Sequence, residues 1–239
     1  MKKLIFCILM TLTTVVSFSQ GKNITIKGQG VLHSLNLSKS SSADRQILGS
    51  PYLNVDYMYG KIILSNGKVV KGLLRYNVRT QNFEMVMDRD TLYISEPSFV
   101  RKVEFAGKTF IYSLALEKVN GKQYLSEGYY EVIAGKGEVS KLLVKHDKNI
   151  KESSYAPTYM GGGGTGAKRY VDEQYYYIKP QEGSAAVRLN GKLDLIKIFS
   201  NSSIESQEIK EYISKNDVNT QKIEDLKKFL NYCNDLRKL

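Results

Sequence analysis

Hydrophobic and polar residues alternate with a period of two through most of residues 60–145. The alternating runs are short, and turn signals separate them, such as Asn-Gly at 66–67 and 120–121 and Ala-Gly at 106–107. Alternation places successive side chains on opposite faces of a strand, and Asn-Gly favours tight hairpin turns. The pattern predicts an antiparallel β meander that closes into a barrel or a sandwich.

The expected strands follow directly from these runs. An isolated strand is expected at 23–27, before a polar linker at 38–44. The meander then comprises four hairpins and one strand pair: 61–64 with 69–76, 83–87 with 91–94, 100–105 with 109–114, 116–119 with 123–125, and 129–133 with 139–145. A last pair, 170–178 and 184–189, follows a glycine-rich stretch and is expected to complete the sheet.

Helical periodicity replaces alternation at the C-terminal end. Residues 193–199 favour a short helix, although a strand also fits, and 204–213 carry an amphipathic helical stripe. A last helix is expected from about Gln221, with Asn219 or Thr220 as its cap. The chain as a whole is therefore predicted to be α+β: a mainly antiparallel β meander, barrel- or sandwich-like, followed by a C-terminal helical segment.

The last helix presents a wide apolar stripe that includes Leu226, Phe229, Leu230 and Cys233. A stripe of this width is expected to face either the core or a partner, because it would promote association if it stayed in water. Cys233 fits the stripe as a small core hydrophobe; as a free thiol it would instead pair between chains or react.

The N-terminus resembles an export signal. Lys2 and Lys3 precede an apolar run over residues 4–16, and Ser17-Phe18-Ser19 supplies small residues for cleavage. The run is shorter than the roughly 20 residues that a membrane span requires. A cleaved signal peptide over residues 1–19 is expected, and its removal would also remove Cys7.

These patterns divide the chain into six segments. They are a signal peptide (1–19), an N-terminal strand and linker (20–59), an antiparallel β domain (60–152), a flexible glycine-rich loop (153–168), a β hairpin that completes the sheet (169–190) and C-terminal helices (191–239).

Sequence motifs for nucleotide binding, metal binding and catalysis are weak. Gly161–Gly166 fits G-x-G-x-x-G by letter, but neither a strand before it nor a helix after it is expected. Only His33 and His146 are present, which excludes zinc clusters of His and Cys, and no G-x-S-x-G elbow occurs. Asp88 and Asp90 suit a tight turn better than a calcium site. No cofactor, metal site or catalytic residue is therefore expected.

Charge and aromatic content indicate binding. The chain has 35 Lys and Arg against 24 Asp and Glu, and 17 tyrosines without a tryptophan. Tyr175 and Tyr177 share one face of an expected strand, and Lys141 and Lys145 lie in a lysine-rich strand. These four residues form a candidate surface for a glycan, a peptide or an anionic polymer. The competing interpretation is cross-strand packing by tyrosine and edge protection by lysine.

Several stretches resemble exported β-rich proteins of Bacteroidota, flavobacteria in particular. The similar stretches are Ser17–Gln20, Gly49–Asn54, Gly60–Gly67, Leu74–Asn77, Phe110–Tyr112 and Ile223–Tyr232. The resemblance implies an envelope with two membranes and a periplasmic or outer-membrane-associated location. It carries no activity and no catalytic residue to this chain.

The leading hypothesis is a non-enzymatic exported protein of the cell envelope that binds a protein partner or an anionic polymer. Nucleic acid is not an expected ligand because of the export signal, and no transmembrane span is expected. One alternative is a hydrolase of glycan or peptide with an Asp/Glu pair in a cleft. Another is an accessory subunit of an outer-membrane complex. Oligomeric state does not follow from the sequence.

Overall fold

The computed structural model describes residues 22–24, 35–39, 47–87, 90–135, 140–152, 168–200 and 205–237. The predicted signal peptide at 1–19 and all but the last residue of the predicted loop at 153–168 lie outside these residues. Within them, no helix has the length and apolar character needed to span a membrane.

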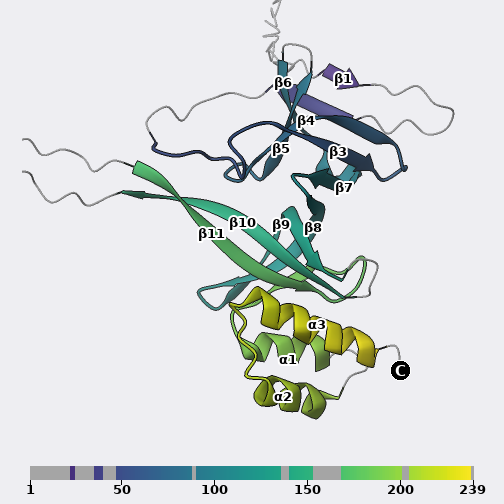
Figure 1. Cartoon of the computed structure of the whole chain (residues 1–239), viewed down its shortest axis with the longest axis vertical. Coiled ribbons are helices and arrows are strands. Elements are labelled where there is room, and N and C mark those ends of the chain that lie inside the picture. The colour runs from purple at the N-terminus through teal and green to yellow at the C-terminus, as the bar shows by residue number, and fades with distance from the viewer. Residues whose placement is uncertain are drawn as a thin grey trace, which may run out of the picture.

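The first part of the sheet, here called the N-terminal β region, is an antiparallel array that ends at β7. It is seen at the upper end of the molecule in Figure 1. Its elements are β1 (Lys22–Ile24), β2 (Leu35–Lys39), β3 (Met58–Leu64), β4 (Val69–Asn77), β5 (Asn82–Met87), β6 (Asp90–Ile94), the 3-10 turn η1 (Pro97–Phe99) and β7 (Val100–Phe105). Strand β2 covers two residues of the linker expected at 38–44, so that part of the prediction is wrong.

The second part comprises a barrel and three helices. Its elements are β8 (Lys108–Val119), β9 (Lys122–Ala134), β10 (Lys141–Glu152), β11 (Lys168–Lys179), β12 (Ala186–Arg188), α1 (Lys192–Ser200), α2 (Ser206–Lys215) and α3 (Ile223–Leu236). The five strands follow the order β8-β12-β11-β10-β9, and an additional β8–β9 pairing closes the ring. The predicted fold class is confirmed: a barrel-like, mainly antiparallel β structure precedes C-terminal helices.

Strands β8 and β9 are longer than the sequence suggested. The pattern had divided them into pieces, but they pair without interruption from Phe110–Glu131 to Val119–Lys122. Their turn is the expected Asn120-Gly121, where both residues have positive φ, 52° and 78°. This backbone geometry is what a primed two-residue hairpin turn requires.

The barrel closes by a short parallel contact. Strand β12 leaves β11 in an antiparallel hairpin and then lies parallel to β8, with Ala186 opposite Ala115 and Val187 opposite Leu116. Strands β10 and β11 continue beyond the ring as a two-stranded ribbon, paired as far as Glu152 and Lys168. Figure 1 shows this ribbon sweeping away from the barrel.

Strand alternation gives the barrel two different faces. The inner face holds a small cluster that includes Ala115, Tyr130, Leu143, Tyr177 and Ala186. The outer face of the same strands contributes other residues, among them Leu142 and Ile178, to a larger cluster with the helices. The barrel therefore buries apolar side chains on both sides of its wall.

The helices pack on the outer wall of the barrel, at the lower end of the molecule in Figure 1. The stripe on α3 lies in that interface, with Leu226, Phe229, Leu230 and Cys233 completely buried. Burial raises the pKa of the Cys233 thiol to about 12, so this cysteine behaves as a core side chain. The stripe thus packs against the protein's own core.

The start of α3 differs from the prediction. The helix has Lys222 as its N-cap residue, with no side-chain cap. Asn219 accepts a hydrogen bond from the backbone N–H of Gln221 at 2.8 Å, and its own N–H donates to Asp225 at 3.1 Å. Asn219 therefore orders the turn before the helix, and neither it nor Thr220 is the cap.

Candidate functional site

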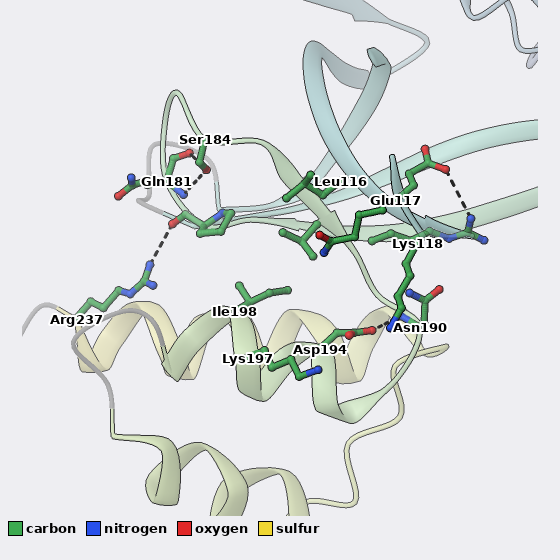
Figure 2. A pocket seen from close by; sticks show the side chains of 14 residues that line it. Leu116, Glu117, Lys118, Gln181, Ser184, Asn190, Asp194, Lys197, Ile198 and Arg237 are labelled. Atoms are coloured by element: carbon green, nitrogen blue, oxygen red, sulfur yellow. Dashed lines mark hydrogen bonds and ion pairs between the residues drawn. The ribbon is translucent and has the colours of Figure 1, made fainter. Parts of the chain in front are cut away.

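A groove runs between the outer wall of the barrel and helix α1. It encloses about 780 Å³, a volume within the usual range of ligand pockets. Strands β8 and β12, the turn before β12, and α1 supply most of its lining. In Figure 2 the labelled side chains run from Arg237, Gln181 and Ser184 at one end, through Leu116 and Ile198, to Lys118, Asn190 and Asp194 at the other.

The centre of the groove is apolar. Leu116 of β8, Val187 of β12 and Ile198 of α1 all line it, and the first two are paired neighbours. Leu116 is still 37% exposed, and Leu125, directly opposite it on β9, is 61% exposed. Leu114 lies on the same outer face and is 46% exposed. Leu114, Leu116 and Leu125, here called the leucine strip, extend the groove centre into solvent.

Glu117 lies between the groove and the barrel interior, where other side chains hold its carboxylate. Its Oε1 accepts hydrogen bonds from Ser126 at 2.7 Å, Lys145 at 3.0 Å and Tyr177 at 3.1 Å. The guanidinium of Arg188 lies 3.8 Å from Oε2. Burial raises the pKa of this carboxyl, but the hydrogen bonds outweigh burial and the pKa falls below its ordinary value of 4.5. Glu117 is therefore a fixed anion at neutral pH.

The other carboxylate of the groove and one of its arginines are also engaged. Asp194 accepts the backbone N–H of Asn190 at 2.8 Å, close to the start of α1. Arg237, at the opposite end, donates to the Ser140 hydroxyl and to the carbonyl of Pro180 at 3.2 Å. Both side chains fix the walls of the groove.

Two lysines that line the groove differ from these side chains in their exposure and pairing. Lys118 on β8 and Lys197 on α1 both line it and are both exposed. Within the part of the chain that the structure describes, neither makes an ion pair. The groove thus combines an apolar centre with two cations that face solvent.

The two tyrosines of the predicted binding surface lie on the inner face of the barrel. Tyr177 is completely buried, and its ring meets that of Tyr130 edge-on at 5.0 Å. Tyr175 is half-buried; its ring carries the guanidinium of Arg188 at 3.8 Å, and its hydroxyl donates to Glu173. Burial comes first among the causes that raise the pKa of Tyr177. These rings pack inside the barrel, as the competing interpretation expected.

The two lysines of that surface are neutralised by carboxylates. Lys141 pairs with Glu182, and Lys145 pairs with Glu117 at 3.0 Å. Two further lysines of β10 have acidic partners on β11, in the pairs Lys148–Asp172 and Lys151–Glu173. The lysine-rich strand therefore presents alternating charges rather than a continuous basic surface. Register explains this, because β10 and β11 pair over twelve residues each.

A second polar cluster lies where the barrel meets the N-terminal β region. Glu131 accepts hydrogen bonds from Lys108 at 2.7 Å and lies 2.7 Å from Nε2 of His146, and both Glu131 and His146 are buried. Burial raises the pKa of Glu131, but hydrogen bonds from His146 and Lys108 outweigh burial and lower it. In the described residues, no group of three or more His, Cys, Asp or Glu side chains has a metal-binding arrangement.

Sequence reasoning did not identify the groove. Leu116, Val187 and Ile198 occupy ordinary apolar positions of strands and a helix, and nothing in the pattern separates them from core residues. One signal was available: Leu114, Leu116 and Leu125 share a face across the Asn120-Gly121 hairpin. That face could be recognised as an exposed strip only once the barrel and α1 were placed.

No protein-family model, curated protein or solved structure matches the chain.

Proposed function

We propose that this is a non-enzymatic, exported protein of the cell envelope that binds a protein partner through the groove and the leucine strip. The observation that carries the proposal is the exposed leucine strip beside an apolar groove of about 780 Å³. Contiguous exposed apolar surface with a polar rim is typical of interaction sites. The N-terminal Lys2-Lys3 and the apolar run after them support export.

A protein partner fits better than an anionic polymer. A polymer site needs a row of free cations, but Lys141, Lys145, Lys148 and Lys151 each have a carboxylate partner. An apolar strip, by contrast, gains free energy only from a ligand with apolar groups of its own. An accessory subunit of an outer-membrane complex would use the same strip, so that role is one form of this proposal.

Binding also fits the carboxylates of the groove better than hydrolysis. A glycosidase of the usual kind uses two carboxyl groups, one of which has a raised pKa and donates a proton. The groove contains Glu117 and Asp194, but the pKa of Glu117 is lowered and its oxygens are held by other side chains. Glu117 therefore acts as a structural anion.

A matched pair of variants tests the proposal. Leu116→Asp places a charge in the centre of the strip, and Leu73→Asp does the same on the outer face of the N-terminal β region. The two leucines have similar exposure, 37% and 44%. Each variant and the parent would be used as bait in cross-linked envelope fractions, and the captured proteins would be quantified by mass spectrometry.

We expect a protein that the parent and Leu73→Asp capture equally and that Leu116→Asp loses. Circular dichroism and the unfolding midpoint establish that both variants are folded. A captured protein that survives Leu116→Asp, or that Leu73→Asp loses instead, would contradict a site at the groove. Release of sugars or peptides by the purified parent would favour the hydrolase.

A further inference from the structure

The groove has a charge pattern that specifies its occupant further. We propose, resting on the proposed function above, that the groove binds an extended acidic segment of the partner polypeptide. Its apolar side chains contact Leu116, Val187 and Ile198, and its carboxylates lie beside Lys118 and Lys197.

The first step concerns charge. Four basic side chains and two carboxylates line the groove. The two carboxylates are already engaged: Glu117 by Lys145 and its neighbours, and Asp194 by the backbone of Asn190. Lys118 and Lys197 remain, exposed and without an ion pair among the described residues. The groove is therefore complementary to an anionic ligand, and a cationic ligand would meet two like charges.

The second step concerns the free edge of β8. This strand pairs with β12 only at Ala115 and Leu116, and the same edge continues past Lys118 with no partner strand in the described residues. Beyond β12 the chain turns away towards α1, which begins at Lys192. An open strand edge beside a groove favours a ligand in extended conformation, because its backbone can add hydrogen bonds to that edge.

The charges and the open edge together restrict the sequence of an extended ligand. In an extended chain, alternate side chains point to opposite sides. Leu116 and Lys118 are two residues apart on β8 and share its outer face, so the same set of ligand side chains, the set that faces the groove, must meet both. Within that set, apolar side chains would contact the centre of the groove, and carboxylates would lie beside Lys118 of β8 and Lys197 of α1. The geometry selects a segment that carries apolar and acidic residues on one face.

Two labelled peptides test this step directly by fluorescence anisotropy. Both are twelve residues long with serine at every second position, and the positions between alternate leucine with glutamate in one peptide and leucine with lysine in the other. Exposed ion pairs are individually weak, so we expect the acidic peptide to bind about tenfold more tightly at ~0.15 M salt. The double variant Lys118→Glu/Lys197→Glu should reverse that preference.

The matched control is Lys71→Glu/Lys210→Glu, which changes the net charge equally at exposed lysines of β4 and α2. It should keep the parent's preference. Equal binding of both peptides, or a preference that Lys118→Glu/Lys197→Glu leaves unchanged, would overturn the inference. Polyglutamate that competes as well as the acidic peptide would overturn it too, since it has no apolar side chains.

Failure here is distinguishable from failure of the proposed function. If Leu116→Asp abolishes partner capture while the two peptides bind equally, the groove is the binding site and the acidic segment is the wrong occupant. If Leu116→Asp changes neither partner capture nor binding of the acidic peptide, both proposals fail.

Discussion

The N-terminal β region and the barrel differ in the side chains that fill their interiors. The first has an interior of aromatic rings, in which Phe83 lies 4.6 Å from Tyr76 and 5.0 Å from Tyr129 between ring centroids. The barrel has charged groups inside, including Lys179, which is buried, and Glu117. Its outer wall packs on the helices instead. We therefore expect packing on the helices to stabilise the barrel, and packing of aromatic rings to stabilise the N-terminal β region.

This difference also explains where the proposed binding site lies. The N-terminal β region is organised around an aromatic core, which Phe110 of β8 and Tyr129 of β9 complete. The barrel needs a covering layer, and α1 covers only part of the wall, which leaves the groove and the leucine strip at the margin. Incomplete coverage of an apolar wall is what makes a docking surface available.

The largest effect is expected from the aromatic core. Phe83→Ala removes a ring that contacts Tyr76, Phe105, Phe110 and Tyr129. Loss of apolar burial and the cavity left behind should lower the free energy of unfolding by about 3–5 kcal/mol. Denaturant unfolding measures it. A loss below about 1 kcal/mol would mean that this core is not the main support of the region.

The corresponding change in the helical layer is Leu230→Ala. Leu230 is completely buried between α3 and the barrel, so we expect a loss of about 2–5 kcal/mol by the same measurement. Lys227→Ala is the control: Lys227 pairs with Glu224 on the helix surface, and its loss should cost about 0.5 kcal/mol or less. If Leu230→Ala unfolds like the parent, the barrel does not depend on its helices.

The charged interior gives a smaller, pH-dependent effect. Glu117→Gln weakens hydrogen bonds to a charged group and should lower the free energy of unfolding by about 1.5–3 kcal/mol at pH 7. The folded-state pKa of Glu117 is below its ordinary 4.5, so its stabilisation is complete above that value. It is then lost as pH falls through the lowered pKa.

Unfolding curves of the parent and Glu117→Gln from pH 7 to pH 3 measure this difference. The two curves should converge as the pH falls below 4.5. A gap that stays constant over the whole range would show that Glu117 acts through shape rather than charge.

The smallest effect is expected at Lys179. Its Nζ donates to the Ser113 hydroxyl at 3.0 Å and to the carbonyl of Ser184 at 2.8 Å, and burial lowers the pKa of this amine. A buried cation is costly, so Lys179→Met should leave stability at pH 7 within about 1 kcal/mol of the parent. A loss as large as that of Glu117→Gln would contradict this.

The lowered pKa of Lys179 also sets the direction in which the free energy of unfolding changes with pH. Because the folded-state pKa is below the ordinary 10.5, the unfolded chain binds more protons between the two values. The parent should therefore gain stability relative to Lys179→Met as the pH rises towards 10.5. Paired unfolding curves between pH 8 and pH 10.5 test that trend.

Local patterns predicted the elements of this fold well. The Asn120-Gly121 turn requires positive φ at two residues, and the apolar stripe of α3 repeats at helical spacing, so both are visible in the sequence. Closure of the barrel was not visible in detail, because the contact between Ala115 and Ala186 joins distant strands. No local pattern encodes such a pairing.

The site was harder to predict for a related reason. Alternation correctly placed Tyr175 and Tyr177 on one face, but it cannot say which face of a strand points into a barrel. Closure directs that face inward, where the hydroxyl of Tyr177 donates to Glu117. For the leucine strip the error runs the other way. Its residues have the pattern of core positions, but they remain exposed because α1 covers only one part of the wall.

Strand β12 has a consequence for the order of folding. Three residues close the ring, and they come after β9, β10 and β11 in the chain. Contacts between distant residues form slowly, because the loop between them must first be closed. If the chain emerges N-terminus first, β8 has a partner in β9 before β12 is present. Until then the edge of β8 at Ala115 and Leu116 is open to other strands, so this interval is when misassembly is most to be expected.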